Sequence, residues 1–264
     1  MIKAIAGSMA GMMLLAAAGC STTPATGPDT GSYTPKPTSE ADVVSRAQIH
    51  TELAAGYLEL GNYAVALQEA GEALKADQNY APAYSVLGLV YMELRDDPAA
   101  ETNFQKALRI SPQDSDVNNN YGWFLCQRKR EKESIRYFLT ALRNPLYATP
   151  DKSWVNAGVC ARLLGDPLAA DDYFQKALKV RPGQPQALLQ LADISFQRKN
   201  YGEAKGYLAR IPREVEPTPE SLWLSLRVER AMGDRNAEKS IGFQLQKKFP
   251  DSREARALAS GQYE

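Results

Sequence analysis

The stretch LGLVYMELRDDPAAETNFQKALRISP, residues 87–112, places apolar residues every three to four positions on both sides of a central Asp-Asp-Pro. This spacing predicts two helices that each bury one face and are joined by a short turn. The pattern returns at an offset of 34 in YGWFLCQRKREKESIRYFLTALRNP, residues 121–145, and at a further offset of 36 between residues 154 and 182. A fixed period of this length indicates a stack of similar helical hairpins.

The repeating unit resembles the tetratricopeptide repeat, a helix–turn–helix of 34 residues. The resemblance implies an all-α superhelix, for which we count about six hairpins and a closing helix, DSREARALAS. The expected repeats are 47–80, 81–114, 115–150, 151–184, 185–218 and 219–252. The last two match the pattern least well, because Ile211 replaces the usual alanine and Glu238 stands at the twentieth position.

Small residues recur at two positions of the repeat. Glycine or alanine at the eighth position, as in Gly88 and Gly122, and alanine at the twentieth, as in Ala100, predict that the two helices of a hairpin approach each other closely, small residue against small residue. Larger residues at the fourth, seventh, eleventh and twenty-fourth positions are expected to fill the space between hairpins. Asp97 and Asp166, each followed by proline, are predicted helix caps.

The N-terminal segment MIKAIAGSMAGMMLLAAAGC has one lysine before a short apolar run, which is typical of an export signal and too short for a membrane-spanning helix. Its LLAAAGC end resembles a bacterial lipoprotein signal, which implies that 1–19 is removed and that Cys20 carries acyl chains. By the same resemblance, Ser21 favours the outer membrane. An ordinary cleaved signal is the alternative, because Ala17 stands where a branched apolar residue is usual. Residues 20–40 are rich in Ser, Thr, Pro and Gly and predict a flexible tether before the repeat domain, 41–264.

The first helix of each repeat is expected to line the inner wall of the stack. The predicted protein-binding groove consists of Thr51, Leu58, Ser85, Leu89, Met92, Asn119 and Trp123. This apolar and polar uncharged set has no cluster of Lys and Arg that could clamp a terminal carboxylate. We therefore expect an amphipathic helix or an extended apolar segment as ligand. Trp123 is the candidate anchor, although a shift of one residue in the alignment would place it in the core.

Charge and residue usage argue against several other functions. Thirty-one Lys and Arg residues balance thirty-one Asp and Glu residues, so no net field favours nucleic acid. A single histidine, His50, does not supply the usual acid–base or nucleophilic sites, and no glycine-rich phosphate loop is present. Two cysteines without a CxxC pair do not supply a zinc site. We expect no catalysis, no cofactor, no metal and no small-molecule substrate.

Cys126 and Cys160 are 34 residues apart, on the first helices of consecutive repeats. In an oxidising periplasm such a pair favours a disulfide, which would contribute about 3 to 4 kcal/mol for a loop of this length. Two buried free thiols are the alternative.

The segment NNYGWFLC, residues 119–126, together with Cys160, resembles the PilF/PilW family of type IV pilus biogenesis lipoproteins. The resemblance extends over the signal, the tether, the six repeats and the closing helix. It implies a pilotin, which binds subunits of the pilus secretin, a PilQ-like outer-membrane channel, and promotes their outer-membrane localisation and multimer assembly. It also implies that the early repeats make this contact. The alternative is a general envelope scaffold lipoprotein that recruits cell-wall enzymes or their regulators.

Overall fold

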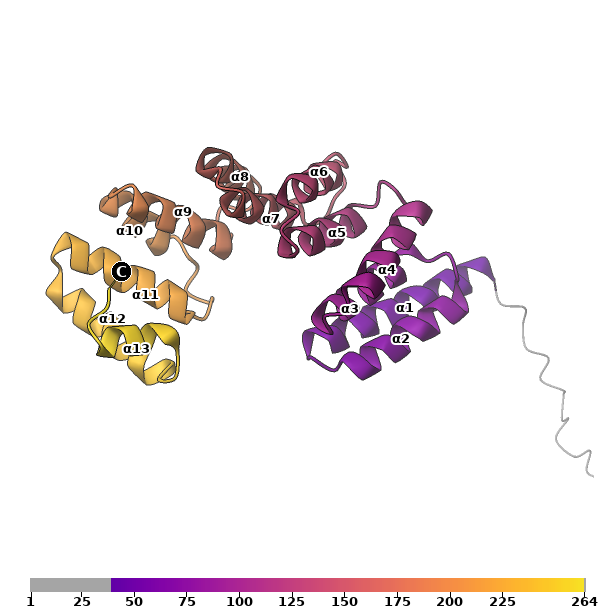
Figure 1. Ribbon diagram of the computed structural model, residues 1–264, viewed down its shortest axis with the longest axis horizontal. Coiled ribbons are helices and arrows are strands. Elements are labelled where there is room, and N and C mark those ends of the chain that lie inside the picture. The colour runs from indigo at the N-terminus through magenta and orange to yellow at the C-terminus, as the bar shows by residue number, and fades with distance from the viewer. Residues whose placement is uncertain (1–38, 264) are drawn as a thin grey trace, which may run out of the picture. The chain divides into compact units, whose positions relative to one another are not determined.

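The computed structural model describes residues 39–263 (Figure 1). Residues 1–38 and Glu264 lie outside the described residues, and with them the predicted signal, Cys20 and nearly all of the predicted tether. Between residues 39 and 263 the chain forms thirteen helices and no strand. None of these helices combines the length and the apolar character needed to cross a bilayer.

Twelve of the helices pair into six consecutive hairpins, numbered here 1 to 6 along the chain. Their bounds are α1 (Glu40–Glu59) and α2 (Tyr63–Ala76), α3 (Ala81–Glu93) and α4 (Asp97–Ile110), α5 (Ser115–Gln127) and α6 (Glu131–Ala141), α7 (Pro150–Leu163) and α8 (Pro167–Val180), α9 (Pro185–Gln197) and α10 (Tyr201–Ala209), and α11 (Pro219–Met232) and α12 (Arg235–Lys248). The last helix, α13 (Arg253–Ala259), packs on hairpin 6. The second helix of each hairpin also packs against the first helix of the next, so the hairpins stack in sequence order. The predicted all-α stack with a closing helix is confirmed.

In hairpins 2 to 4, a glycine of the first helix faces a phenylalanine of the second. The pairs are Gly88 with Phe104, Gly122 with Phe138, and Gly158 with Phe174. A Cβ atom on any of these glycines would lie between 2.5 and 2.8 Å from the nearest ring atom, and each ring is fully buried. Small residues of both helices share a cluster as expected in hairpins 1 and 5, Ala54 with Ala66 and Ala192 with Ala204. In hairpins 2 to 4 the nearest neighbour of the glycine is instead the large residue at position 24, which the sequence analysis did not predict. The glycine makes room for the large residue at position 24, because a close-packed interior has no other space for the ring.

In hairpin 6 the large residue of this pair is on the first helix and the glycine is on the second. Its eighth position is Leu226, which is fully buried, and its twenty-fourth is Gly242. A Cβ atom on Gly242 would lie 3.4 Å from a methyl group of Leu226 and 3.2 Å from one of Leu258 in α13. The large residue thus comes from the first helix in hairpin 6, and the closing helix packs over the glycine of the second.

Most second helices begin with an acidic or amide cap. Asp166 caps α8 as predicted, since its side chain accepts a hydrogen bond from the backbone N–H of Ala169. In α4, however, the cap is Asp96 and not the predicted Asp97. Asp97 lies one position further along, inside the helix, where its carboxylate accepts two hydrogen bonds from the guanidinium of Arg128 in the next hairpin, at 2.5 and 2.7 Å.

A disulfide joins hairpins 3 and 4. It links Cys126 in α5 to Cys160 in α7, whose Cα atoms are 5.8 Å apart. The two sulfur-bearing side chains are buried and pack with Phe138 and Ala157. The disulfide therefore cross-links the first helices of consecutive hairpins from inside the core.

Candidate functional site

One side of α1 carries apolar residues that no described segment covers. We call this surface the α1 face and define it by Ile49, Leu53, Gly56, Tyr57 and Leu60, which recur at helical spacing. Ile49 is 53% exposed, Leu53 44% and Leu60 80%. Together with Glu52 they line an open hollow of about 450 Å³.

The repeat explains why this surface is apolar. At an offset of 34, the positions of Ile49 and Gly56 correspond to Ala83 and Val90 of α3, which are fully buried. Val90 packs in a cluster with Ala54 and other small residues of hairpin 1. The α1 face is thus the surface that would pack against a preceding hairpin. Among residues 39–263 no such hairpin exists. The α1 face therefore carries apolar residues like those of the core, but they are exposed to solvent.

The residues of the predicted groove divide into two groups in the structure. Thr51, Ser85, Met92 and Asn119 are buried, and Leu58, Leu89 and Trp123 are partly exposed. Leu89, Met92 and Trp123 come together in one cluster on hairpins 2 and 3, while Leu58 packs in the cluster of hairpin 1. The three partly exposed side chains are available for contact. Their role in binding stays a prediction.

The buried polar members of this set bond within the protein. Asn119 accepts hydrogen bonds from the hydroxyl of Ser153 at 2.8 Å and from the amide of Asn156 at 3.1 Å, both in α7. The Asn120 amide donates to the hydroxyl of Ser85 in α3, at 3.1 Å. These bonds tie the first helices of hairpins 2, 3 and 4 together, since buried polar groups need partners. Ser85 and Asn119, which we expected to face a ligand, therefore bond to polar side chains of the next hairpin. The Thr51 hydroxyl donates to the backbone carbonyl of Ala47 in its own helix.

Trp123 lines a second, polar hollow of about 550 Å³ between hairpins 2 and 3. Its other lining residues are Met92, Glu93, Arg95, Asp97, Gln127 and Arg128. One part of the indole packs against the buried aromatic cluster around Phe104 and Phe124, and another against the disulfide cluster. Trp123 thus contributes to the core and also presents a surface to solvent.

The arginines of the basic turn at residues 127–132 form ion pairs with carboxylates of hairpin 2. Arg130 donates a hydrogen bond to Glu101 of hairpin 2 at 2.7 Å, and the buried Tyr121 hydroxyl donates to the same carboxylate at 2.9 Å. The bond from Arg130 holds the pKa of the Glu101 carboxyl below its usual value. Burial and the bond to Glu101 raise the pKa of Tyr121 to about 12. The arginines of this turn therefore hold consecutive hairpins together.

The described residues contain no group of three or more His, Cys, Asp or Glu side chains that could hold a metal ion. The Nδ1 atom of His50 lies 2.7 Å from a carboxylate oxygen of Glu69, which links α1 to α2. This contact gives the histidine a structural role within hairpin 1.

Sequence reasoning missed the α1 face. Ile49, Leu53 and Gly56 carry the signal that could have found it, because they continue the apolar pattern of the repeat at positions whose counterparts pack against a preceding hairpin. The seventh and eleventh positions, here Leu53 and Tyr57, were expected to fill the space between hairpins in every repeat, whereas the third and tenth positions, here Ile49 and Gly56, were not assigned. Leu53 is 44% exposed instead, because no hairpin precedes α1 among residues 39–263.

Residues 70–207 match the tetratricopeptide repeat family. Over 205 residues, which are 78% of this chain and 81% of the relative, the sequence is 30% identical to the type IV pilus assembly protein PilF of Pseudomonas aeruginosa. The fold is similar to the crystal structure of PilW, a type IV pilus biogenesis factor, with 32% identity and a TM-score of 0.70 over 81% of this chain and 98% of that one. A structure of Pseudomonas aeruginosa PilF gives 28% identity and a TM-score of 0.73 over 83% and 99% of the two chains.

Proposed function

Because this chain belongs to the PilF/PilW family of type IV pilus biogenesis proteins, which are built from tetratricopeptide repeats, we propose that it acts as a pilotin. In this proposal the protein is held at the outer membrane by acyl chains on Cys20. It binds subunits of the pilus secretin and promotes their localisation and assembly into multimers. The observation that carries the proposal is the apolar α1 face, which no segment within residues 39–263 covers, in a protein of pilus biogenesis.

The α1 face suits an amphipathic helix. Its counterpart on α3 packs against the helices of hairpin 1, so the α1 face has the shape and spacing that accept helical neighbours. Full burial of a leucine or isoleucine side chain contributes about 1.5 to 3 kcal/mol, and Ile49, Leu53 and Leu60 are each at least two-fifths exposed. We propose that a secretin segment packs here and that the partly exposed Leu58, Leu89 and Trp123 extend the contact along hairpins 1 to 3.

An anchor and a tether would make this contact efficient. The segment between Cys20 and α1 has about 20 residues, and a flexible chain of that length has a mean extension of ~25 Å. The binding surface would then remain close to the membrane, which raises its effective concentration for a membrane-bound partner. Multiple acyl chains on one residue are needed for stable anchoring.

A pair of substitutions in one helix tests the proposal. Leu53→Asp places a charge in the centre of the α1 face. The matched control is Val44→Asp, because Val44 is 42% exposed and lies nine residues earlier, on the opposite side of α1. We expect Leu53→Asp to leave most of the secretin as monomers and Val44→Asp to leave multimers at the normal level, as measured by electrophoresis of envelope fractions under conditions that preserve multimers.

Three results would count against the proposal. Normal secretin multimers and normal pili in a strain that lacks this protein would exclude a pilotin. Normal multimers with Leu53→Asp, at an unchanged protein level, would exclude the α1 face as the contact. Recovery of cell-wall hydrolases without secretin in a pull-down of the full-length protein would favour an envelope scaffold.

A further inference from the structure

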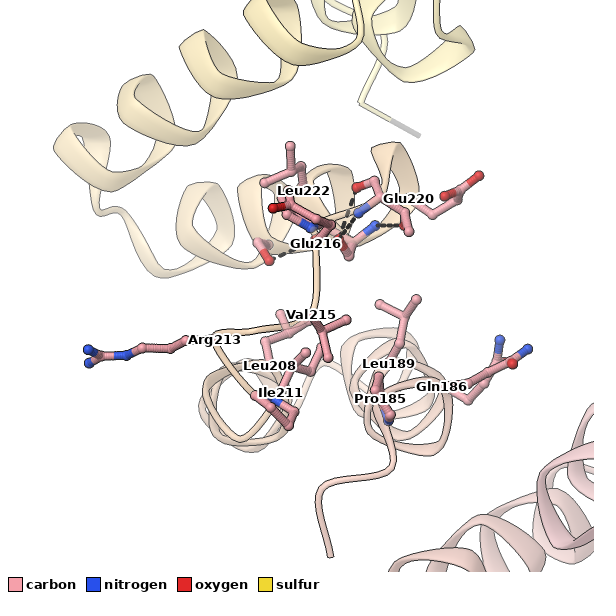
Figure 2. Close-up of a pocket in the computed structure, with 16 residues that line it drawn as sticks. Pro185, Gln186, Leu189, Leu208, Ile211, Arg213, Val215, Glu216, Glu220 and Leu222 are labelled. Carbon is pink, nitrogen blue, oxygen red and sulfur yellow. Dashed lines mark hydrogen bonds between the residues drawn. The ribbon is translucent and has the colours of Figure 1, made fainter. Parts of the chain in front are cut away.

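A third hollow, of about 620 Å³, lies between hairpins 5 and 6, far along the chain from the α1 face. Figure 2 shows its walls. Leu189 of α9 and Leu208 of α10 lie on one side with Ile211 and Val215 of the connecting segment, and Leu222 of α11 lies across from them. The hollow is open to solvent, and its floor is apolar.

The hollow exists because α10 ends early. Helix α8 has 14 residues and is followed by a connection of residues 181–184, whereas α10 has 9 residues and is followed by residues 210–218. Pro212 explains the difference, because proline inside a helix removes a hydrogen bond and collides with the preceding turn. At an offset of 34, Pro212 takes the place of Leu178 in α8, which is 6% exposed and packs with Leu188 of the next hairpin. The turn of helix that fills this space after hairpin 4 is absent after hairpin 5.

A charged recess of about 220 Å³ adjoins the hollow and shares Leu189, Gln190 and Glu220 with it. Its charged lining comprises Asp193, Glu220 and Glu254 against Arg162 and Arg227, so carboxylates outnumber guanidinium groups by three to two. Asp193 is paired with Arg162 at 2.6 Å. Among the described residues, Glu220 and Glu254 form no ion pair.

The charged residues at the mouth of the hollow do not cancel the excess of carboxylates in the recess. Arg213 points away from the hollow, on the side opposite to Glu220 and Gln186 (Figure 2). Glu216 is paired with Lys248 at 3.1 Å on the exposed surface. Arg227, like Glu220 and Glu254, forms no ion pair among the described residues, and its guanidinium lies over the ring of Phe196. With Asp193 and Arg162 paired, two carboxylates and one guanidinium remain, so the recess keeps an excess of one negative charge and favours a cation.

We propose that the hollow and the recess together bind a short extended segment of a partner protein, which inserts one large apolar side chain into the hollow and places a Lys or Arg in the recess. The hollow and the recess are two adjoining spaces of about 620 and 220 Å³, one with an apolar floor and one lined by charges, and so suit two different side chains of one short segment. An extended segment needs room for its anchoring side chains alone. This site is separate from the α1 face, and the proposal does not depend on the pilotin function.

The test uses random dodecapeptides displayed on phage, selected on the full-length protein in detergent micelles. We expect the selected peptides to carry a large apolar residue within a few positions of a Lys or Arg. Val215→Asp places a charge at the wall of the hollow, where Val215 is 38% exposed, and should weaken binding of the corresponding synthetic peptides about tenfold or more. Glu220→Lys should weaken it about threefold to tenfold through like-charge repulsion.

Matched controls separate the site from general effects. Val180→Asp changes a valine that is 49% exposed at the end of α8 and does not line the hollow, and it should leave peptide affinity unchanged. Leu53→Asp, which tests the α1 face, should also leave it unchanged. Thermal unfolding followed by circular dichroism checks that each variant is folded.

Four outcomes would overturn the proposal. The selection could yield no binding peptide, or only acidic peptides. The affinity of the selected peptides could be the same for Val215→Asp as for Val180→Asp. Sedimentation could show that the protein alone forms a dimer that Val215→Asp dissolves, which would identify a second copy as the occupant.

Discussion

Hairpins 2 to 4 and hairpins 5 to 6 use the same repeat with different packing. In the first region a glycine in the first helix receives a phenylalanine from the second. In the second region the corresponding pairs are Ala192 with Leu208, and Leu226 with Gly242. Each pair combines a small and a large residue, and in hairpin 6 alone among these five hairpins the large residue stands on the first helix. The repeat therefore requires that one large side chain fill the space between its two helices, and either helix can supply that side chain.

The two regions also differ in how their hairpins are joined. A disulfide and a set of buried amide and hydroxyl hydrogen bonds link hairpins 3 and 4. Hairpins 5 and 6 share an apolar cluster that includes Ala204 and Val228, and the ion pair of Lys205 with Glu229 at 2.9 Å also links them. No disulfide joins these two hairpins, their shortened α10 leaves an open hollow, and a partly exposed ion pair is screened by solvent and adds little. The central region is therefore expected to be the more stable part of the stack.

The largest expected effect comes from moving the packing of hairpin 6 into hairpin 4. Gly158→Leu forces a side chain against the buried ring of Phe174, and Phe174→Gly leaves a cavity in its place. Each single change should lower the free energy of unfolding by about 3 kcal/mol or more in urea titrations. The double variant should recover at least ~1 kcal/mol relative to the sum of the two. If the effects of the two substitutions on the free energy of unfolding simply added, a leucine on the first helix could not replace the phenylalanine of the second in hairpin 4.

The next effect concerns the disulfide. Replacing both Cys126 and Cys160 by serine should lower the free energy of unfolding by about 3 kcal/mol, because the unfolded chain is no longer constrained across a loop of this size. Hydrogen exchange should show faster amide exchange in α5 and α7, with little change in α11 and α12. Equal acceleration along the whole chain would contradict the view that the two regions are stabilised separately.

The smallest effect is at the turns inside the hairpins. Lys199 in hairpin 5 has a φ of 61°, at the position where hairpin 4 has Gly165 with a φ of 81°. Because a side chain at positive φ costs about 1 kcal/mol, Lys199→Gly should raise the free energy of unfolding by about 0.5 to 1 kcal/mol, and Gly165→Lys should lower it by a similar amount. Thermal unfolding of the two variants measures both shifts. A loss of stability in Lys199→Gly would show that the lysine side chain makes a compensating contact.

Much of the fold could be predicted from the residues alone. The offset of 34 between the Leu87 and Tyr121 segments predicted the hairpins, and the segment at residues 119–126 predicted the family to which the chain belongs. The partner of Gly88 could not be predicted, because a small residue in a sequence shows that space is needed and does not show what fills it. Asp96 and Asp97 could not be told apart as caps, because both are carboxylates at the start of α4. Which of them caps the helix depends on the residue at which the helix begins.

The sequence by itself determined the number of hairpins, their order and the apolar character of α1. These follow from periodicity, which depends on local spacing and needs no knowledge of distant contacts. Three features depend on tertiary contacts: nothing within residues 39–263 covers Ile49 and Leu53, Ser85 and Asn119 bond to neighbouring hairpins, and Pro212 leaves a hollow where α8 has another turn of helix. Each of these depends on what lies next to a residue in space, and in a stack of similar units the same residue type is interior in one repeat and surface in another.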